Sequence, residues 1–253
     1  MQVDKALEAI WAGMQQGQHH PAAWQGRLSM ADGYRVQLGV LDRLVAAGER
    51  HAGWKVGLTA KAMQEQHRVF EPVLGFLLES GHRASGVAFR FDDLIGPGFE
   101  NELCITMGHT LRGPGVTSES ARAAIAEVAP ALEIVERRGD LTGDLPLALA
   151  DNAQQKAFVT GPARALGALD LASVTVDVRV NGAHQERAAG TAVLDPPVAS
   201  IAWLANKLAE LGRSLEAGVR VMSGSFTRQY PIARGDRVEV HFEPLGAVIA
   251  TFH

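Results

Sequence analysis

Short strand-like segments follow one another closely in the C-terminal half of the chain, and they limit the folds that it can adopt. Residues 173–180 alternate β-branched with polar side chains and end at Asn181-Gly182, a pair typical of hairpin turns. Residues 237–242 and 246–252 predict a final hairpin. Many short strands with few helices favour a closed or rolled mixed β-sheet over a doubly wound sheet.

The first 50 residues differ, because their apolar side chains recur at helical spacing. Ser29, with Asp32 three residues later, predicts a capped helix start. We therefore expect an α+β fold in which an N-terminal helical segment, residues 1–50, precedes a catalytic mixed β-roll domain, residues 51–253. Strand-like or apolar runs in that domain include residues 54–58, 70–78, 99–107, 129–136 and 218–224, and helical patterns cover residues 60–67, 118–128 and 197–211.

Charge and cysteine content restrict the class of protein. The net charge is −4, and no basic block is present, which argues against nucleic acid or an anionic membrane surface as a partner. The single cysteine, Cys104, excludes an internal disulfide and fits a reducing compartment; its place in a predicted strand indicates a packed core thiol. The sequence starts without a signal-peptide pattern and has no apolar run of membrane-spanning length. We expect a cytoplasmic enzyme.

Three glutamates form the main candidate for a metal site. Glu100 and Glu102 stand two apart in the predicted strand 99–107, so their side chains point to the same face, and Glu133 lies in the apolar run 129–135. Adjacent buried carboxylates repel one another, and a divalent cation relieves that repulsion. Oxygen ligands of this kind suit Mg²⁺ or Mn²⁺. The alternative is a group of solvent-facing acids on an exposed sheet face.

The histidines show no zinc-binding spacing. Nine are present, and His67, His109 and His241 stand singly in predicted elements, where we expect surface or hydrogen-bonded side chains. His19-His20 resembles a metal-binding tract, but we interpret it as a mobile or surface pair.

Seven segments, in order and spacing, resemble the motifs of the 2-oxopent-4-enoate hydratase and 4-oxalocrotonate decarboxylase family, within the fumarylacetoacetate hydrolase superfamily. The resemblance covers residues 30–252, and no single motif carries it. The segments are 54–59, 99–102, 111–115, 130–135, 151–153, 193–208 (its two parts being 193–194 and 202–208) and 223–227, followed by the pairs 235–236 and 245–246.

The resemblance implies a rolled mixed β-structure with an N-terminal helical segment, and a cytoplasmic homo-oligomer that can associate with a paralogous hydratase or decarboxylase. It implies one Mg²⁺ or Mn²⁺ ion held by Glu100, Glu102 and Glu133. The substrates implied are 2-oxo and 2-hydroxy-dienoic acids from the ring-cleavage degradation of aromatic compounds.

Lys55 stands at the family's lysine position. It would bind the substrate carboxylate or exchange protons, provided that burial and the cation lower its pKa; the alternative is a surface lysine.

Five further residues are candidates for substrate binding: Leu58, Thr59, Asn152, Ser225 and Thr227. Leu58 and Thr59 belong to the segment of Lys55. Ser225 and Thr227 would hold a carboxylate with hydroxyls from a glycine-hinged loop, or would serve only the turn. Asn152 would orient a substrate oxygen or cap a turn.

Several positions depart from the family pattern. Many hydratases of this group have an aspartate where this chain has Val73, whereas the decarboxylases have an aliphatic residue there. The sequence around Ser225, ending in Arg228, is typical of hydratases that act on longer dioic acids; Arg228 would bind a distal carboxylate or lie at the surface. Gln154 and Gln155 replace two family serines.

The interpretation that we adopt is a metal-dependent hydratase that converts a 2-hydroxy-2,4-dienoate to a 4-hydroxy-2-oxo acid. Because valine at position 73 cannot move protons or position water, Glu71 is the candidate catalytic residue for that role, unless it is an exposed turn acid. The alternatives are a 2-oxo-3-hexenedioate (4-oxalocrotonate) decarboxylase and a non-catalytic partner subunit. A C–C hydrolase would need a water-activating histidine–glutamate pair, which the sequence does not place.

Overall fold

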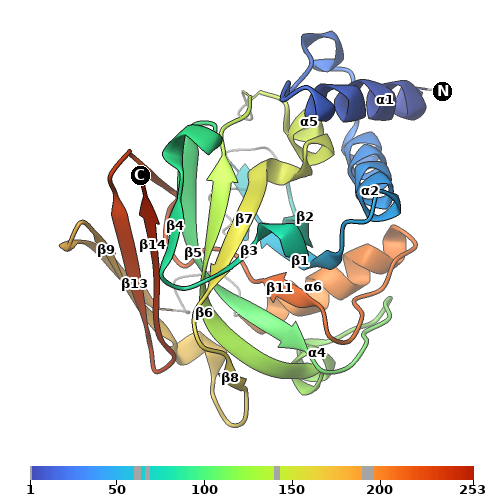
Figure 1. Ribbon diagram of the computed structural model, residues 1–253. Helices are drawn as coiled ribbons and strands as arrows, with labels where there is room; N and C mark the ends of the chain where they lie inside the picture. Colours follow the sequence, from blue (N-terminus) through green and yellow to red (C-terminus); the bar gives the residue numbers. More distant parts are fainter. Residues whose placement is uncertain (1, 60–63, 66–68, 140–142, 190–196) are drawn as a thin grey trace.

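The computed structural model describes residues 2–59, 64–65, 69–139, 143–189 and 197–253. Among these residues the strands form two sheets, one of nine strands and one of five (Figure 1). Helices lie around the larger sheet, and the prediction of an α+β fold with a rolled mixed sheet is confirmed. The helix predicted over 60–67 and the motif at 193–194 fall partly or wholly outside the described residues.

The N-terminal helices begin where capping and helical periodicity predict. Helix α1 spans Gln2–Gln15, a short 3₁₀ helix η1 spans Ala22–Trp24, and α2 spans Met30–Ala46. Ser29 and Asp32 form a reciprocal capping box, in which the Asp32 backbone N–H donates to Ser29 Oγ at 3.1 Å. The division into two units at residue 50 stays a prediction.

The larger sheet has the strand order β2-β1-β11-β5-β6-β7-β3, with β12 added to β5 and β8 to β6. It is mixed: β1 pairs with β11 and β3 with β7 in parallel, and the other pairs are antiparallel. The strands are β1 His51–Gly57, β2 Val73–Leu78, β3 His82–Ala84, β5 Pro97–Met107, β6 Ile125–Glu136, β7 Gln155–Thr160, β8 Arg164–Ala165, β11 Arg220–Met222 and β12 Tyr230–Pro231.

The curl of this sheet determines where the polar groups meet. Strands β1 and β6 are separated by β11 and β5, so in a flat sheet they would lie about 14 Å apart. Yet Lys55 Nζ of β1 lies 3.5 Å from Glu133 Oε1 of β6. The sheet is therefore rolled (Figure 1), and Lys55 and Glu133 come together on the same side of it.

The second sheet contains the two predicted hairpins. Its strand order is β10-β9-β13-β14-β4. Residues Asn181 and Gly182 connect β9 to β10 with φ values of 54° and 79°, the left-handed conformation that this hairpin turn requires. The strands are β4 Val87–Phe89, β9 Thr175–Val180, β10 Ala183–Ala189, β13 Arg237–Glu243 and β14 Gly246–Phe252.

Three more helices cover the larger sheet: α4 Ser118–Ala123, α5 Leu145–Ala150 and α6 Pro197–Glu210. Helix α6 ends at Glu210, one residue before the predicted end, and Gly212, whose φ is +71°, follows it as predicted. The helix predicted over 118–128 is wrong beyond residue 123. Strand β6 begins at Ile125 and pairs with β5, so pairing within the sheet overrides the local helical pattern. Among the described residues, no helix is both long and apolar enough to cross a membrane.

Candidate metal centre and active site

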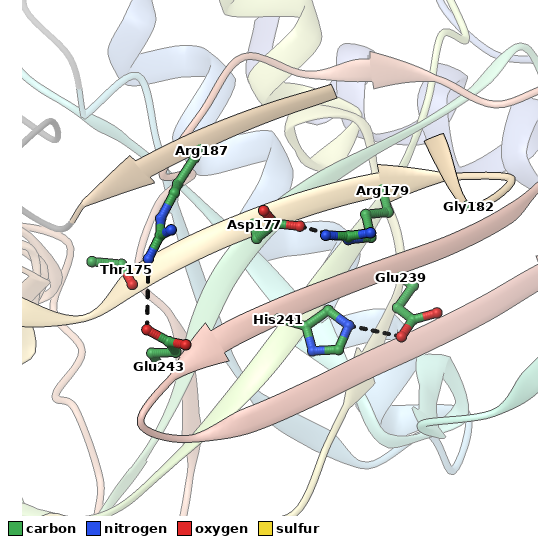
Figure 2. Close-up of a pocket in the computed structure, with 8 residues that line it drawn as sticks. All are labelled: Thr175, Asp177, Arg179, Gly182, Arg187, Glu239, His241 and Glu243. Atoms are coloured by element: carbon green, nitrogen blue, oxygen red, sulfur yellow. Dashed lines mark hydrogen bonds and ion pairs between the residues drawn. The ribbon is translucent and has the colours of Figure 1, made fainter. Parts of the chain in front are cut away.

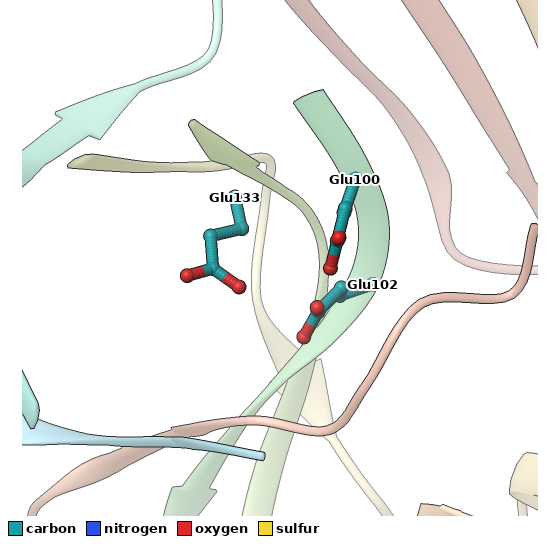
Figure 3. Close-up of side chains that lie close together, drawn as sticks. All are labelled: Glu100, Glu102 and Glu133. Carbon is teal, nitrogen blue, oxygen red and sulfur yellow. The ribbon is translucent and has the colours of Figure 1, made fainter. Parts of the chain in front are cut away.

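Three carboxylates converge on the concave face of the larger sheet (Figure 3). Glu100 and Glu102 extend from β5, and Glu133 extends from β6, directly opposite Glu100 in the antiparallel register. One oxygen of each carboxylate lies within 4.8 Å of the others. The two-residue period of a strand explains the first pair, and the strand register, which the sequence does not specify, adds the third acid.

Burial makes this group energetically costly without a cation. Glu102 and Glu133 are 0% exposed. Glu102 Oε2 accepts a hydrogen bond from the Gly224 backbone N–H at 2.9 Å, but Glu102 Oε1 and both Glu133 oxygens have no hydrogen-bond partner. Burial raises the pKa of Glu102 well above its ordinary value, and the Glu133 charge adds to the effect. Burial also raises the pKa of Glu133 to about 7, although Lys55 opposes the shift.

Lys55 supplies the buried positive charge beside this group. Its side chain is 6% exposed, and Nζ lies 3.5 Å from Glu133 Oε1. Burial alone would lower the pKa of Lys55, but the charges of Glu133, Glu100 and Glu102 outweigh burial, and the pKa is raised. The sequence led us to expect that burial and a cation would lower the pKa of Lys55. With only carboxylates beside the amine, the pKa is raised instead. The surface-lysine alternative is excluded by this burial.

The unpartnered oxygens fit a divalent cation. Mg²⁺ and Mn²⁺ in proteins bind to two or three carboxylates whose oxygens have free lone pairs. The three glutamates offer such a set, and two of them are fully buried. A cation would supply the partner that hydrogen bonds do not supply here. The alternative of exposed acids on an open sheet face does not hold for Glu102 and Glu133.

Two glycines that the sequence analysis did not single out make room for the lysine. Gly75 of β2 pairs with Lys55 of β1, and a Cβ on Gly75 would lie 3.1 Å from Lys55 Cε and 3.0 Å from Asn152 Oδ1. A Cβ on Gly57 would lie 3.5 Å from Lys55 Nζ and 3.4 Å from Val73 Cγ2. Val73 and the Lys55 amine therefore border the same space beside Gly57. Glycine inside a strand pattern signals such a close approach and could have identified both positions.

The loop after β11 closes one side of the group. Gly224, at φ +101°, donates to Glu102 and packs so tightly on Thr59 that a Cβ would lie 2.5 Å from Thr59 Cγ2. Ser225 Oγ donates to the Asn101 carbonyl at 3.4 Å, and Asn101 Nδ2 donates to Thr227 Oγ1 at 2.6 Å. Both hydroxyls thus attach the loop to the residue between the two β5 glutamates. Their roles in substrate binding stay predictions.

The remaining candidates lie in different surroundings. Asn152 is buried, and its amide donates to the Phe76 carbonyl at 3.0 Å and accepts from the Phe76 N–H at 2.7 Å. Leu58 is partly buried, with φ 53°, and packs on the core. The Glu71 carboxylate is 46% exposed and lies 2.8 Å from Lys207 Nζ, an ion pair between the entry to β2 and helix α6. Their proposed roles are not tested by these contacts.

Three other expectations have clear outcomes. Cys104 is buried, and burial raises the pKa of its thiol to about 12, so the prediction of a packed core thiol is confirmed. Arg228 is exposed, and its guanidinium lies 4.8 Å from the centre of the Tyr230 ring. The surface interpretation of His19-His20 is wrong: their side chains are 17% and 6% exposed, and both contact the Asp151 carboxylate.

A hollow of about 580 Å³ lies elsewhere, on the polar face of the five-stranded sheet (Figure 2). Its charges pair among themselves: Arg179 with Asp177 at 2.8 Å, His241 with Glu239 at 2.7 Å, and Arg187 with Glu243 at 3.6 Å. Arg187 and Glu243 are more than half exposed, and the other four side chains are between 22% and 47% exposed. Solvated, mutually neutralised charges are what an outer sheet face carries, so the acid cluster is the stronger candidate site.

Comparison with known proteins gives consistent matches. Residues 43–253 match the family model described as fumarylacetoacetate (FAA) hydrolase C-terminal. The chain is 36% identical to 2-hydroxyhexa-2,4-dienoate hydratase of Comamonas testosteroni, over 89% of this chain and 87% of that protein. It is also 36% identical to 4-oxalocrotonate decarboxylase of Pseudomonas sp. (strain CF600), over 89% of this chain and 86% of that protein.

A solved structure is similar over the whole chain. It is 4-oxalocrotonate decarboxylase from Pseudomonas putida G7 in complex with magnesium and adipate. The TM-score is 0.94 at 34% sequence identity, and the match covers 100% of this chain and 97% of that one.

Proposed function

The chain belongs to the fumarylacetoacetate hydrolase family, and on this premise we propose that it is a divalent-metal-dependent lyase of 2-hydroxy-2,4-dienoates and their 2-oxo-4-enoate tautomers. One observation carries the proposal: three clustered carboxylates, two of them fully buried with oxygens that lack hydrogen-bond partners, lie beside a buried lysine. A 2-oxo acid presents a carboxylate and a neighbouring oxygen, which suit a cation and an ammonium group together.

Glu100, Glu102 and Glu133 would hold the Mg²⁺ or Mn²⁺ ion. When bound, the ion would supply positive charge where negative charge develops on the 2-oxo oxygen of the substrate. The structure of a relative contains magnesium and adipate, a six-carbon diacid, which supports a divalent cation and a dicarboxylic acid as ligands of this fold. The Gly224 N–H, bonded to Glu102 Oε2, fixes the orientation of that ligand.

Lys55 would hold the substrate carboxylate or move a proton. Its ammonium group lies at the concave face beside Glu133, and Gly57 and Gly75 leave open space around its stem. Thr59 and the loop at Ser225 and Thr227 would border the substrate, the loop being anchored to Asn101. Burial of this region excludes water from side reactions and strengthens each charge interaction.

The first candidate reaction is hydration to a 4-hydroxy-2-oxo acid, as in the hydratase relative. It needs a group that delivers water near C4. To do so, Glu71 would have to leave its ion pair with Lys207. Lys55 would therefore carry more of the proton transfer.

Decarboxylation is the second candidate, and one observation favours it. Val73 borders the space beside Gly57 that the Lys55 amine also borders, and a hydratase of this group would present a carboxylate at that position. An aliphatic side chain there neither moves protons nor orders water, but it leaves the loss of CO₂ from a 2-oxo-3-hexenedioate unhindered. The similarity to the Pseudomonas putida G7 decarboxylase supports the same reading.

A direct assay separates these readings. The protein with Mg²⁺ is incubated separately with 2-hydroxypentadienoate and with 2-oxo-3-hexenedioate, and hydrated product and CO₂ are measured in each. Hydration of either substrate supports the hydratase. Stoichiometric CO₂ release without hydration supports the decarboxylase instead. If metal binds and neither substrate reacts, a non-catalytic partner subunit is the better description. Glu102→Gln should abolish turnover, while Glu127→Gln, an exposed acid on β6, should leave it unchanged.

Two variants test the acid at the entry to β2. If the enzyme is a hydratase through Glu71, Glu71→Gln lowers hydration and Val73→Asp maintains or raises it. If it is a decarboxylase, Glu71→Gln has little effect and Val73→Asp lowers CO₂ release. We further propose, from the family resemblance, a cytoplasmic homo-oligomer in the degradation of aromatic compounds, able to associate with a paralogous hydratase or decarboxylase.

A further inference from the structure

The turn that follows helix α5 has an unusual backbone. Asn152, Ala153 and Gln154 have φ values of 58°, 48° and 68°, so three consecutive non-glycine residues adopt the left-handed region. Each such residue is disfavoured, and the conformation persists only where surrounding contacts impose it. The contacts that hold this turn are therefore informative about its purpose.

Arg138 holds both ends of the turn. Its Nε donates to Asp151 Oδ2 at 2.6 Å and one terminal nitrogen donates to the Asp151 carbonyl at 2.6 Å. The other terminal nitrogen donates to the Gln155 carbonyl at 3.1 Å. The guanidinium thus fixes the distance between residues 151 and 155, which the left-handed turn connects.

The N-terminal segment supplies the other supports. His19 Nδ1 forms a hydrogen bond with Asp151 Oδ1 at 3.4 Å, and His20 Nε2 lies at an ion-pair distance of 3.2 Å from Asp151 Oδ2 without hydrogen-bond geometry. The His20 ring is packed on Gly139, where any side chain would collide with it. From α2, Gln37 Nε2 donates to the Leu149 carbonyl at 2.8 Å and to the Leu74 carbonyl at 3.1 Å. The segment before residue 50 therefore connects α5, the turn and β2.

In this position, the turn of residues 152–154 forms one wall of the candidate active site. The Asn152 amide pairs with both backbone groups of Phe76 in β2. Next to Phe76, Asn152 Oδ1 and Lys55 Cε border the same space over Gly75, because both lie within 3.1 Å of where a Gly75 Cβ would be. A displacement of the turn would therefore change the space that the lysine stem borders.

We propose that His19 and His20 are positioning residues for Lys55: they hold Asp151, and through the left-handed turn they fix Asn152 against Phe76 and the lysine stem. The inference rests on the proposed function for the role of Lys55, but its structural part does not. Neither histidine touches the acid cluster among the described contacts, so both act through the turn.

The structural part is tested by hydrogen exchange of the Phe76 amide, which donates to Asn152 Oδ1. In His19→Ala/His20→Ala this amide should exchange about tenfold faster or more, while the Val240 amide in the second sheet keeps its rate. His19→Asn/His20→Gln, which retains a donor at each contact position, should restore the wild-type rate. The control is His184→Ala, which removes a histidine–aspartate pair on the outer sheet. Unchanged Phe76 exchange in the double alanine variant overturns the proposal, whatever reaction the enzyme catalyses.

The functional part is tested by kinetics on whichever substrate turns over. The double alanine variant should lose about 10- to 100-fold in kcat, the usual scale for a displaced catalytic group, with Mn²⁺ affinity and KM changed less than about twofold. The Asn/Gln variant should recover kcat. If the double variant does not fold, the single variant His19→Ala, at the more exposed histidine, replaces it, with a smaller loss expected. Wild-type kcat in a folded variant, or equal losses in kcat and metal affinity, contradicts a role in positioning Lys55.

Discussion

Replacing Glu133 by glutamine should remove a penalty that the metal-free protein carries. The Glu133 carboxyl is fully buried, it has no hydrogen-bond partner, and two other acids lie close to it. Glutamine has nearly the same shape but no charge. The stability of the metal-free protein should therefore depend less steeply on pH in Glu133→Gln than in the wild type.

The size and sign follow from the pKa. Burial raises the pKa of Glu133 from an ordinary 4.5 to about 7 in the folded state. Between these values the folded protein binds more protons than the unfolded chain, so stability falls as the pH rises. At 1.36 kcal/mol per pKa unit, the loss is roughly 3 kcal/mol once the pH exceeds the folded pKa. The pKa of Glu102 is raised as well, which acts in the same direction.

Thermal unfolding with a chelator present measures the effect. In the wild type, the Tm at pH 8 should lie below that at pH 5 by roughly 10 °C more than in Glu133→Gln, given about 2–4 °C per kcal/mol for a chain of this size. The matched control is Glu127→Gln, the same substitution at an exposed position of β6, which should behave as the wild type.

Metal should reverse the trend. Carboxylate ligands must lose their protons to bind a cation, so the rise in Tm on adding Mg²⁺ or Mn²⁺ should grow from pH 5 to pH 8. The reasoning is refuted if the wild type and Glu133→Gln have the same pH dependence without metal, or if Glu133→Gln retains the full metal-induced stabilisation.

Three further predictions concern single side chains. Lys55→Ala should lower kcat roughly 100-fold or more in steady-state assays, with Tm nearly unchanged at saturating metal, and near-normal turnover would remove this residue from the site. Gly75→Ala should lower kcat about tenfold or more, because its Cβ would press on Lys55 Cε, whereas Gly57→Ala, with ordinary contact distances, should have a milder effect; equal kinetics in the two variants would contradict this account. Ser29→Ala should cost about 1 kcal/mol in urea denaturation and leave activity unchanged, and the absence of any loss would show that the helix cap contributes nothing.

Local sequence patterns predicted the parts of the fold that depend on local chemistry. The capping pair Ser29 and Asp32, the turn Asn181-Gly182 and the left-handed Gly212 after α6 each appear where propensity and turn geometry predict. The pairing of Glu100 with Glu102 on one face follows from the strand period alone. Glu133 was a candidate third acid because it lies in the apolar run 129–135, but its place opposite Glu100 depends on strand register, which the sequence does not specify.

Features that depend on long-range contacts were not predictable in this way. His19 and Asp151 are 132 residues apart, and no local signal distinguishes a buried histidine from a surface one. Lys207 is 136 residues from Glu71, so the ion pair between them could not be expected from either neighbourhood. The helical pattern of 118–128 is genuine over its first turns, but pairing of β6 with β5 determines the rest.

Charge balance connects the acid cluster to the kind of substrate that it can take. When all three carboxyl groups are ionised, they and the one ammonium group leave a net charge of −2 in a largely buried space, and one divalent cation neutralises it. An arriving substrate carboxylate then adds a negative charge that only a redistribution of contacts can compensate.

Lys55 is suited to exchange Glu133 for the substrate carboxylate, because its distance of 3.5 Å from Glu133 is an ion-pair contact without a well-formed hydrogen bond. When metal neutralises Glu133, the ammonium group is released for the substrate, so metal binding and substrate binding should be cooperative, each strengthening the other. Titration of Mn²⁺ with and without a non-reacting 2-oxo acid measures this coupling, and independent affinities would show that Lys55 does not change its partner.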